Sequence, residues 1–380
     1  MKQIGQYLAI YFKKLDKWLV IALLLCSSLS VLLLYSIFRT GILSSVGASY
    51  YRTQLFASIL GIVIMLIFAL VDYHKIVRLW FLYAPVALLL TLLTFTALGE
   101  RRAGADDQAW LNFGFIRFQP SEVLKLAFAM TFSLHLAKDE KNMNHPLHML
   151  LLLVHGMIPI GLIALQGDYG TAIVFGVMFL SMLLMAKISW KYVLAGVIAI
   201  PVALYFLWNY VLGSTHKNRI LVLLHPGTDP EGLEYQQDLG LSALSSGELF
   251  GKGLFFKDGV SVPEMHNDFI FSYVGETFGF VGAMAVVVVL TFLCLKVLFD
   301  GIRSNDKLGT FLCVGIFGML FAHCFLNIGM VLKVMPVIGI PLPFLSAGGT
   351  AILSMYVAMG LVLSVYSHNE KRYRIFYDAD

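Results

Sequence analysis

Ten apolar runs divide this sequence, and each is about as long as a helix that crosses a lipid bilayer. About 20 apolar helical residues span the roughly 30 Å hydrocarbon core of a membrane. The chain is 59% hydrophobic and 13% charged, about half the charged fraction of a typical soluble domain. We therefore predict an all-α polytopic integral membrane protein with ten transmembrane helices. The runs lie at 17–37, 53–71, 78–98, 122–137, 147–166, 168–186, 191–212, 268–299, 308–332 and 345–367.

Lysine and arginine residues are concentrated in one of the two sets of loops that these spans create. If the N-terminus is cytoplasmic, the inner segments are short and basic, as the positive-inside rule requires. Both termini are then cytoplasmic, and the long 213–267 loop between spans seven and eight is extracytoplasmic. A formal net charge of +4 does not indicate nucleic-acid binding, because basic residues in membrane proteins mainly set orientation. We predict an interfacial helix at 1–16, a membrane domain at 17–367 and a cytoplasmic tail at 368–380.

Three titratable side chains stand where the long loop meets the eighth span. Glu264, His266 and Asp268 occupy alternate positions there, and charge at such a depth is costly unless it serves chemistry or pairing. On a helix that begins near Pro263, Glu264 and Asp268 share a face. In an extended segment all three side chains share one. Either geometry predicts two neighbouring carboxylates.

Other polar groups interrupt the spans on the same side of the membrane. Ser121 is the predicted N-cap of span four. Glu122 and Lys125 share a helix face, either as a structural ion pair or as a charged site that faces the bundle interior. Asp168 is either the N-cap of span six or a carboxylate that shares a cavity with Asp268. The proline- and glycine-rich segment at 336–350 is either a broken-helix element beside a site or a tight loop.

Five motifs follow one another in an order that resembles the SEDS family (shape, elongation, division and sporulation proteins). The last two motifs resemble the RodA branch of that family more than its FtsW branch. The sequence departs from the family pattern at several positions, among them Gly167 and Ala347. The motifs are FQPSEVLK at 118–125, preceded by Trp110, then QGDYGT at 166–171, PEMHNDFIF at 263–271, NIGM at 327–330 and GIPLPFLSAGG at 339–349.

The resemblance implies a peptidoglycan glycosyltransferase of the bacterial cytoplasmic membrane that serves cell elongation and shape. Its substrate is lipid II, an undecaprenyl-pyrophosphate-linked disaccharide peptide. Its implied partners are a class B penicillin-binding protein (a transpeptidase) and the cell-elongation complex. Asp268 is the expected general base of an inverting displacement. The expected substrate-binding residues are Glu264, His266, Glu122, Lys125, Asp168, Arg219, Arg117, Trp110, Gln119 and Ser346.

Several alternatives remain open from the sequence. A divalent cation, Mg²⁺ or Mn²⁺, can assist such a reaction, but no ligand spacing identifies a metal site. Intramembrane charges and broken helices also fit a lipid II flippase. A non-catalytic scaffold for the transpeptidase and an FtsW-like division polymerase are further hypotheses. We predict that Lys125→Ala abolishes polymerisation and leaves expression and thermal stability near those of wild type; activity that instead falls in step with stability would favour the structural ion pair.

Overall fold

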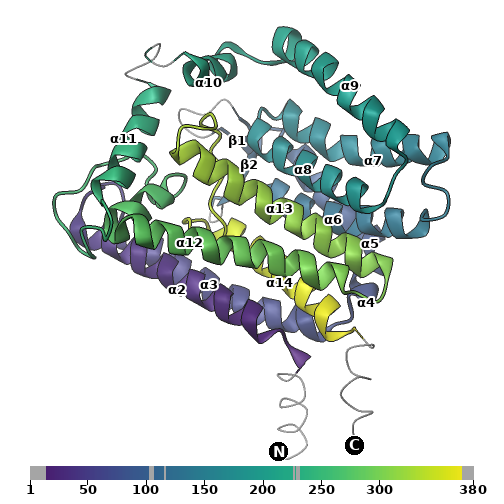
Figure 1. Ribbon diagram of the computed structural model, residues 1–380, viewed down its shortest axis with the longest axis horizontal. Helices are drawn as coiled ribbons and strands as arrows, with labels where there is room; N and C mark the ends of the chain where they lie inside the picture. The colour runs from purple at the N-terminus through teal and green to yellow at the C-terminus, as the bar shows by residue number, and fades with distance from the viewer. Residues whose placement is uncertain (1–13, 102–106, 115–116, 226, 228–231, 370–380) are drawn as a thin grey trace, which may run out of the picture.

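Ten helices that coincide with the ten predicted spans form a bundle in the computed structural model, which describes residues 14–101, 107–114, 117–225, 227 and 232–369 (Figure 1). Seven of them are long and apolar enough to cross a membrane by length and composition. Of the others, α5 and α8 are shorter apolar helices, and α6 carries Glu122 and Lys125. The all-α polytopic prediction is confirmed. The ten helices are α2 (Lys17–Thr40), α3 (Ala48–Leu70), α5 (Trp80–Leu93), α6 (Pro120–Lys138), α7 (Pro146–Leu165), α8 (Tyr169–Met185), α9 (Trp190–Phe206), α12 (Ile270–Ile302), α13 (Lys307–Val331) and α14 (Gly349–Ser367).

The predicted terminal segments fall largely outside the described residues. Only residues 14–16 of the expected interfacial helix are described, and only 368–369 of the expected tail.

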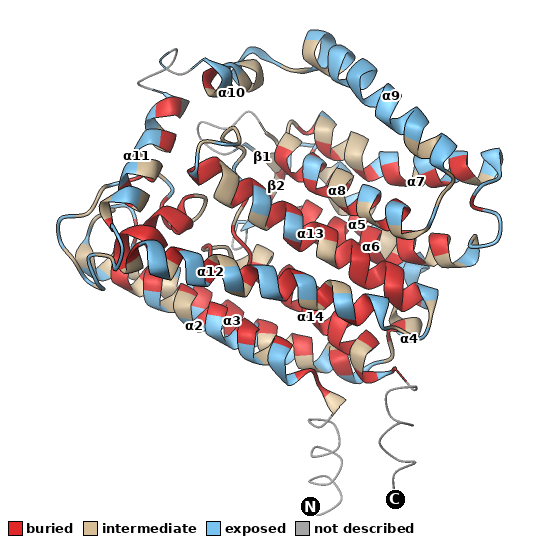
Figure 2. Cartoon of the chain, in the orientation of Figure 1, coloured by how far each residue is buried: buried red, intermediate tan, exposed pale blue. Residues whose placement is uncertain are grey.

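Helix α13 runs through the centre of the bundle. It packs against α6, α8 and α12, and α14 packs against α3 on the neighbouring side. In the most apolar stretch of each helix, 72% of the α13 residues and 67% of the α14 residues are buried. Figure 2 shows this burial as red ribbon along both helices. A polar side chain on α13 therefore reaches the interior of the protein and must find partners there.

Helix α9 stands apart from the other helices (Figures 1 and 2). None of its residues is buried, and its apolar side chains point in all directions, as in a helix surrounded by lipid. At one end Tyr192 donates a hydrogen bond to the Asn144 carbonyl (3.1 Å). Beyond its other end, in the π-helix η1 (Leu207–Val211), the Val211 carbonyl accepts a bond from Tyr169 (3.5 Å). Among the described residues, these hydrogen bonds link the span to the rest of the protein near its two ends.

The loops contain structure that the sequence did not predict. Three short antiparallel strands join in the order β1-β2-β3, between α5 and α6. A short helix, α4, precedes α5, and two helices lie inside the predicted long loop. The elements are β1 (Gly99–Glu100), β2 (Trp110–Asn112), β3 (Arg117–Phe118), α4 (Tyr73–Arg78), α10 (Ser214–Leu224) and α11 (Leu233–Ser246).

Helix α12 is kinked at Gly279, where φ is 68° and ψ is −167°. The loop that follows α11 attaches to α12 at this kink, where the Phe280 amide donates a hydrogen bond to the Glu248 carbonyl (2.7 Å). Nearby, the fully buried Glu276 carboxylate accepts hydrogen bonds from Lys252 Nζ (2.7 Å) and the Val260 amide (3.0 Å). The end of the long loop is therefore fixed to α12.

The two ends of the bundle carry different features. Lys296, near the end of α12, pairs with Asp16 at the start of α2. Ser367, at the end of α14, donates to the Ala69 carbonyl (3.1 Å). The first and last described helices thus have their terminal ends on one side, and α10, α11 and the 262–269 segment lie on the other (Figure 1). We call this second side the loop end.

Candidate functional site

The 262–269 segment forms consecutive turns before α12, so it has neither of the regular geometries expected from the sequence. Glu264 has a φ of +55°, and its carbonyl accepts bonds from the Asn267 amide (3.0 Å) and the Phe269 amide (3.2 Å). A positive φ is unusual for a side chain other than glycine and often marks a functional or strained position. Asp268 therefore precedes the helix rather than opening it.

The three titratable side chains of this segment differ in their surroundings. The Glu264 side chain is 56% exposed, and its carboxylate lies 3.9 Å from His266 Nε2. His266 is buried and its ring packs edge-on against Tyr50 of α3, with centroids 4.6 Å apart. Asp268 is half-buried, and a Cβ added to Gly339 would lie 3.5 Å from its carboxylate. The Asp268 carboxylate thus faces the backbone of the irregular segment between α13 and α14.

Three consecutive carbonyls of the turn are held by this irregular segment and by α13. The Ala347 amide donates to the His266 carbonyl (2.9 Å), Ser346 Oγ to the Asn267 carbonyl (2.6 Å) and Asn327 Nδ2 to the Asp268 carbonyl (2.8 Å). The Ser346 hydroxyl also accepts a hydrogen bond from the Leu342 amide (2.8 Å), so both of its hydrogen bonds are to the protein backbone. These bonds satisfy carbonyls that have no helical partner, and they fix the backbone that carries Asp268.

Glu122 and Lys125 form an ion pair that faces the bundle interior. Lys125 Nζ lies 2.9 Å from the Glu122 carboxylate, and both side chains are almost completely buried. Ser354 of α14 donates to the other Glu122 oxygen (2.5 Å). His323 of α13 lies with its Nε2 3.0 Å from Lys125 Nζ. The pair is thus a buried, hydrogen-bonded network that joins α6, α13 and α14.

Helix α6 begins differently from the prediction. Its N-cap is Gln119 and Pro120 occupies the first turn, so the assignment of Ser121 as N-cap is wrong. Proline favours the first helical position because its missing N–H needs no partner there, and this shifts the cap two residues earlier. The Gln119 amide is free to donate to Asp168 (3.1 Å).

Asp168 is the N-cap of α8, as one of the two hypotheses stated. Its second oxygen accepts the Thr171 amide at 2.9 Å, the usual role of a capping aspartate. The start of α8 lies against the irregular segment, because a Cβ on Gly170 would meet Ile338 at 2.3 Å. Since Gly339 borders Asp268, residues 338–339 lie between the start of α8 and the Asp268 carboxylate.

The two arginines of the predicted site lie in different places. Arg219 of α10 donates to the Val337 carbonyl (3.3 Å), beside the segment that borders Asp268. The Arg117 side chain is 68% exposed and pairs with Glu100 at 3.0 Å. Trp110 faces Glu100 in the same small sheet. Arg219 therefore adjoins the Asp268 region, and Arg117 and Trp110 belong to the sheet.

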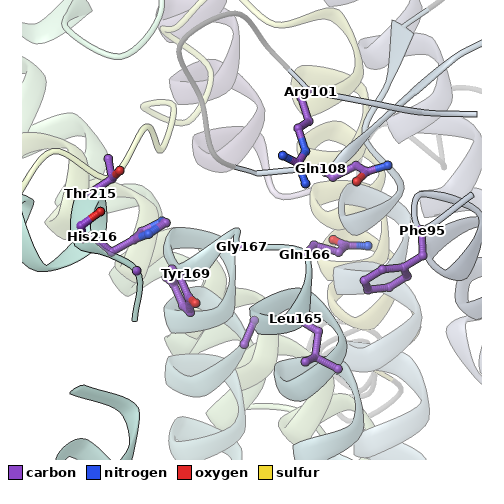
Figure 3. A pocket seen from close by; sticks show the side chains of 12 residues that line it. Phe95, Arg101, Gln108, Leu165, Gln166, Gly167, Tyr169, Thr215 and His216 are labelled. Atoms are coloured by element: carbon purple, nitrogen blue, oxygen red, sulfur yellow. The ribbon is translucent and has the colours of Figure 1, made fainter. Parts of the chain in front are cut away.

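A cavity of about 400 Å³ is lined by Gly167 and Tyr169 at the loop end (Figure 3). Arg101, Gln108 and Thr215 supply polar groups, and Leu165 an apolar one. Tyr169 and His216, which both line it, pack edge-to-face with ring centroids 4.5 Å apart. The cavity joins the start of α8 to α10, the helix that carries Arg219.

His323 and Ser354 could not be selected from the motifs, because neither residue lies in one of them. His323 is one helical turn before Asn327, and an ionisable residue inside a span is itself a signal. Among the described residues, no three His, Cys, Asp or Glu side chains are arranged to hold a metal ion.

Fold and site together define a multi-pass helical membrane protein. Its interior holds the buried Glu122–Lys125 pair, and hydrogen bonds fix the backbone around Asp268. The chain matches the family model FTSW_RODA_SPOVE, described as cell cycle protein, over residues 16–371, and it belongs to that family.

Curated relatives cover most of the chain. It is 30% identical over 319 residues to the peptidoglycan glycosyltransferase MrdB of Escherichia coli K12, covering 82% of this chain and 84% of that protein. It is also 30% identical over 352 residues to the probable peptidoglycan glycosyltransferase FtsW of Borreliella burgdorferi, covering 91% and 94%.

Two solved structures share the fold. One is a chain of a peptidoglycan synthase complex described as coordinating polymerization and crosslinking, with 24% identity, a TM-score of 0.79 and coverage of 95% and 99%. The other is Thermus thermophilus rod shape determining protein RodA, with 22% identity, a TM-score of 0.68 and coverage of 93% and 97%.

Proposed function

We propose that this protein is a peptidoglycan glycosyltransferase that polymerises lipid II into glycan strands, as the names of its relatives suggest. The observation that carries the proposal is the set of three hydrogen bonds to the carbonyls of residues 266–268. These bonds fix Asp268 against the 338–339 backbone. A general base must be held at a defined distance from the proton it takes. A rigid backbone around one half-buried carboxylate supplies that condition.

In the proposed reaction a sugar hydroxyl attacks the anomeric carbon of a second lipid-linked sugar. The hydroxyl proton passes to the Asp268 carboxylate, the new glycosidic bond forms, and the bond to the diphosphate breaks. A single displacement inverts the anomeric configuration. The diphosphate already carries its charge and leaves without a general acid, so one well-placed base is sufficient for the proton transfer.

Positive groups near Asp268 suit a diphosphate leaving group. Arg219 reaches the Val337 carbonyl at the edge of the site, and the ammonium of Lys125 lies deeper in the bundle. Fixed positive charges in a water-poor site stabilise negative charge as it develops. Glu264, which is exposed, lies next to His266, which is buried, and the two side chains can orient the polar part of the substrate.

We propose further that the loop end faces the outside of the cytoplasmic membrane and that both termini are cytoplasmic. The basic residues of the inner loops support this orientation. A class B penicillin-binding protein is the proposed partner within the cell-elongation complex. The structural neighbour from a synthase complex that coordinates polymerization and crosslinking supports such a partnership.

The proposal is tested with purified protein and lipid II in detergent micelles, with and without the transpeptidase. Micelles have no second leaflet, so a flippase has no measurable reaction there, and a scaffold forms no glycan by itself. We expect glycan strands from this protein in the absence of any other polymerase. No polymer under either condition, from protein that is folded, contradicts the proposed function.

A further inference from the structure

His323 connects the buried ion pair to the segment that borders Asp268. It is 1% exposed, on the central helix α13. Its Nε2 lies 3.0 Å from Lys125 Nζ, and its Nδ1 lies 3.1 Å from the Pro341 carbonyl oxygen. One imidazole ring therefore spans the distance between α6 and the irregular segment.

The two partners of His323 fix its protonation state. A lysine ammonium can only donate, so Nε2 must accept. A carbonyl oxygen can only accept, so Nδ1 must carry the hydrogen. The imidazole is thus neutral, with its hydrogen on Nδ1. Lys125 donates another hydrogen to Glu122 (2.9 Å), and the network is internally consistent.

Asn327 makes a parallel connection one helical turn further along α13. Residues four apart lie on the same helix face. Asn327 Nδ2 donates to the Asp268 carbonyl (2.8 Å) and to the Ile340 carbonyl (2.8 Å). His323 holds the neighbouring Pro341 carbonyl. Two adjacent carbonyls of the irregular segment are therefore hydrogen-bonded to α13, and His323, which makes one of these two bonds, also contacts Lys125.

We propose that His323 is a positioning residue for Asp268. Its hydrogen bond to the Pro341 carbonyl sets the position of the 339–341 backbone relative to the Asp268 carboxylate. Because the same ring contacts Lys125, this position also depends on the Glu122–Lys125 pair. Because Gly339 lies against the Asp268 carboxylate, a shift of this backbone moves the carboxylate or opens space beside it. Misplacement by about 1 Å can cost on the order of 10²-fold in rate. This inference rests on the proposed function of Asp268.

Two substitutions that differ by one methylene group test the inference. His323→Gln keeps one acceptor and one donor on a side chain long enough to reach both Lys125 and Pro341. His323→Asn has the same two groups on a shorter side chain, which reaches only one partner. We expect kcat for polymerisation within about threefold of wild type for His323→Gln and reduced about tenfold or more for His323→Asn, with KM for lipid II nearly unchanged.

His155→Asn is the matched control. His155 lies between α6 and α7, where it contacts His135 (3.0 Å) and Thr131 (3.2 Å), and it touches neither Lys125 nor Pro341 in the described contacts. We expect this variant to lose thermal stability and to keep kcat per folded molecule. If His323→Asn behaves in the same way, or if His323→Gln is as slow as His323→Asn, the positioning role is wrong.

Hydrogen exchange of the 338–348 backbone gives a readout that does not need activity. We expect faster exchange in His323→Asn than in wild type and near-normal exchange in His323→Gln, because only the shorter side chain releases one end of the connection. Equal exchange in all three proteins contradicts the inference. Inactive wild-type protein with the expected exchange pattern would contradict the proposed function and leave the connection through His323 supported.

Discussion

At the scale of single residues, burial determines what the charges of this protein can do. Lys125 is 1% exposed and Glu122 is 3% exposed, so neither has water to compensate the loss of the other. Removing one member of a buried ion pair leaves an uncompensated charge, which costs more than removing both. Each member of the pair is therefore needed for stability while the other is present.

This burial gives a prediction for Lys125 that differs from the one made from the sequence. We expect Lys125→Met to lower the free energy of unfolding by about 3–5 kcal/mol, because the buried Glu122 carboxylate loses its ion pair and keeps the hydrogen bond from Ser354. The double variant Glu122→Gln/Lys125→Met should be more stable than the single one. Thermal unfolding in detergent measures both. A single variant as stable as wild type contradicts this account and restores the sequence-based expectation.

A second residue-scale prediction concerns pH and the end of the bundle opposite the site. His74 Nδ1 lies 2.8 Å from Asp72 and its Nε2 lies 2.7 Å from Asp306, so it connects α4 to the loop before α13. Partial burial opposes the charged ring, but the hydrogen bonds and charges of Asp72 and Asp306 outweigh it and raise the pKa of His74.

A pKa raised by folding stabilises the protein below the unfolded value of about 6.5, and this contribution is lost as pH rises through the folded value. We expect the thermal midpoint to fall as pH is raised from about 6 to about 9, and to fall less in His74→Phe. Melting curves of both proteins across this range are the measurement. Equal slopes in the two proteins show that His74 makes no such contribution.

At the scale of elements, the helical regularity of α12 is interrupted at Gly279, where the loop that follows α11 attaches. Gly279 has a backbone conformation that residues with a Cβ rarely adopt, and a Cβ there would lie 2.4 Å from the Gly251 nitrogen. The kink is also where residues 248–253 attach to α12. Its glycine is therefore required by both backbone conformation and space.

We expect Gly279→Ala to destabilise the protein by about 1–3 kcal/mol or more and to loosen the 248–253 loop. Gly161→Ala in α7 is the matched control, because nothing lies within 4 Å of the added Cβ and alanine favours a helix. Unfolding curves of the two variants, with proteolysis of the loop, give the comparison. An equally small effect of both substitutions contradicts the role assigned to the kink.

At the scale of the whole molecule, the ten spans could be predicted because hydrocarbon selects apolar runs whatever the packing. The position of α13 at the centre could not, since its apolar content resembles that of the lipid-exposed α9. Asp268 and Lys125 could be selected from motifs. Two features could not be predicted: the turn in which Glu264 has a positive φ, and the contacts of His323 with Lys125 and Pro341. Both depend on segments that are distant in the sequence, and no local sequence pattern specifies such contacts.

The proposed orientation can be tested on cysteine variants made in a background without the four native cysteines. Phe250, in the loop attached to α12, is 80% exposed, and Asn142 is exposed between α6 and α7. In spheroplasts we expect an impermeant maleimide to label Phe250→Cys, and to label Asn142→Cys only after the membrane is opened. Labelling of both from the outside contradicts the ten-span arrangement.

The most direct test of the central claim is polymer formation and lipid II affinity, measured on one purified sample of Asp268→Asn. Asparagine is nearly isosteric and leaves the backbone bonds to Asn327 and its neighbours in place, but it cannot accept the proton. A general base contributes about 10²- to 10⁴-fold, so we predict that polymerisation falls by at least about two orders of magnitude while affinity for lipid II is retained. Polymerisation near the wild-type rate would contradict the account, and loss of affinity together with activity would make Asp268 a binding residue instead of the base.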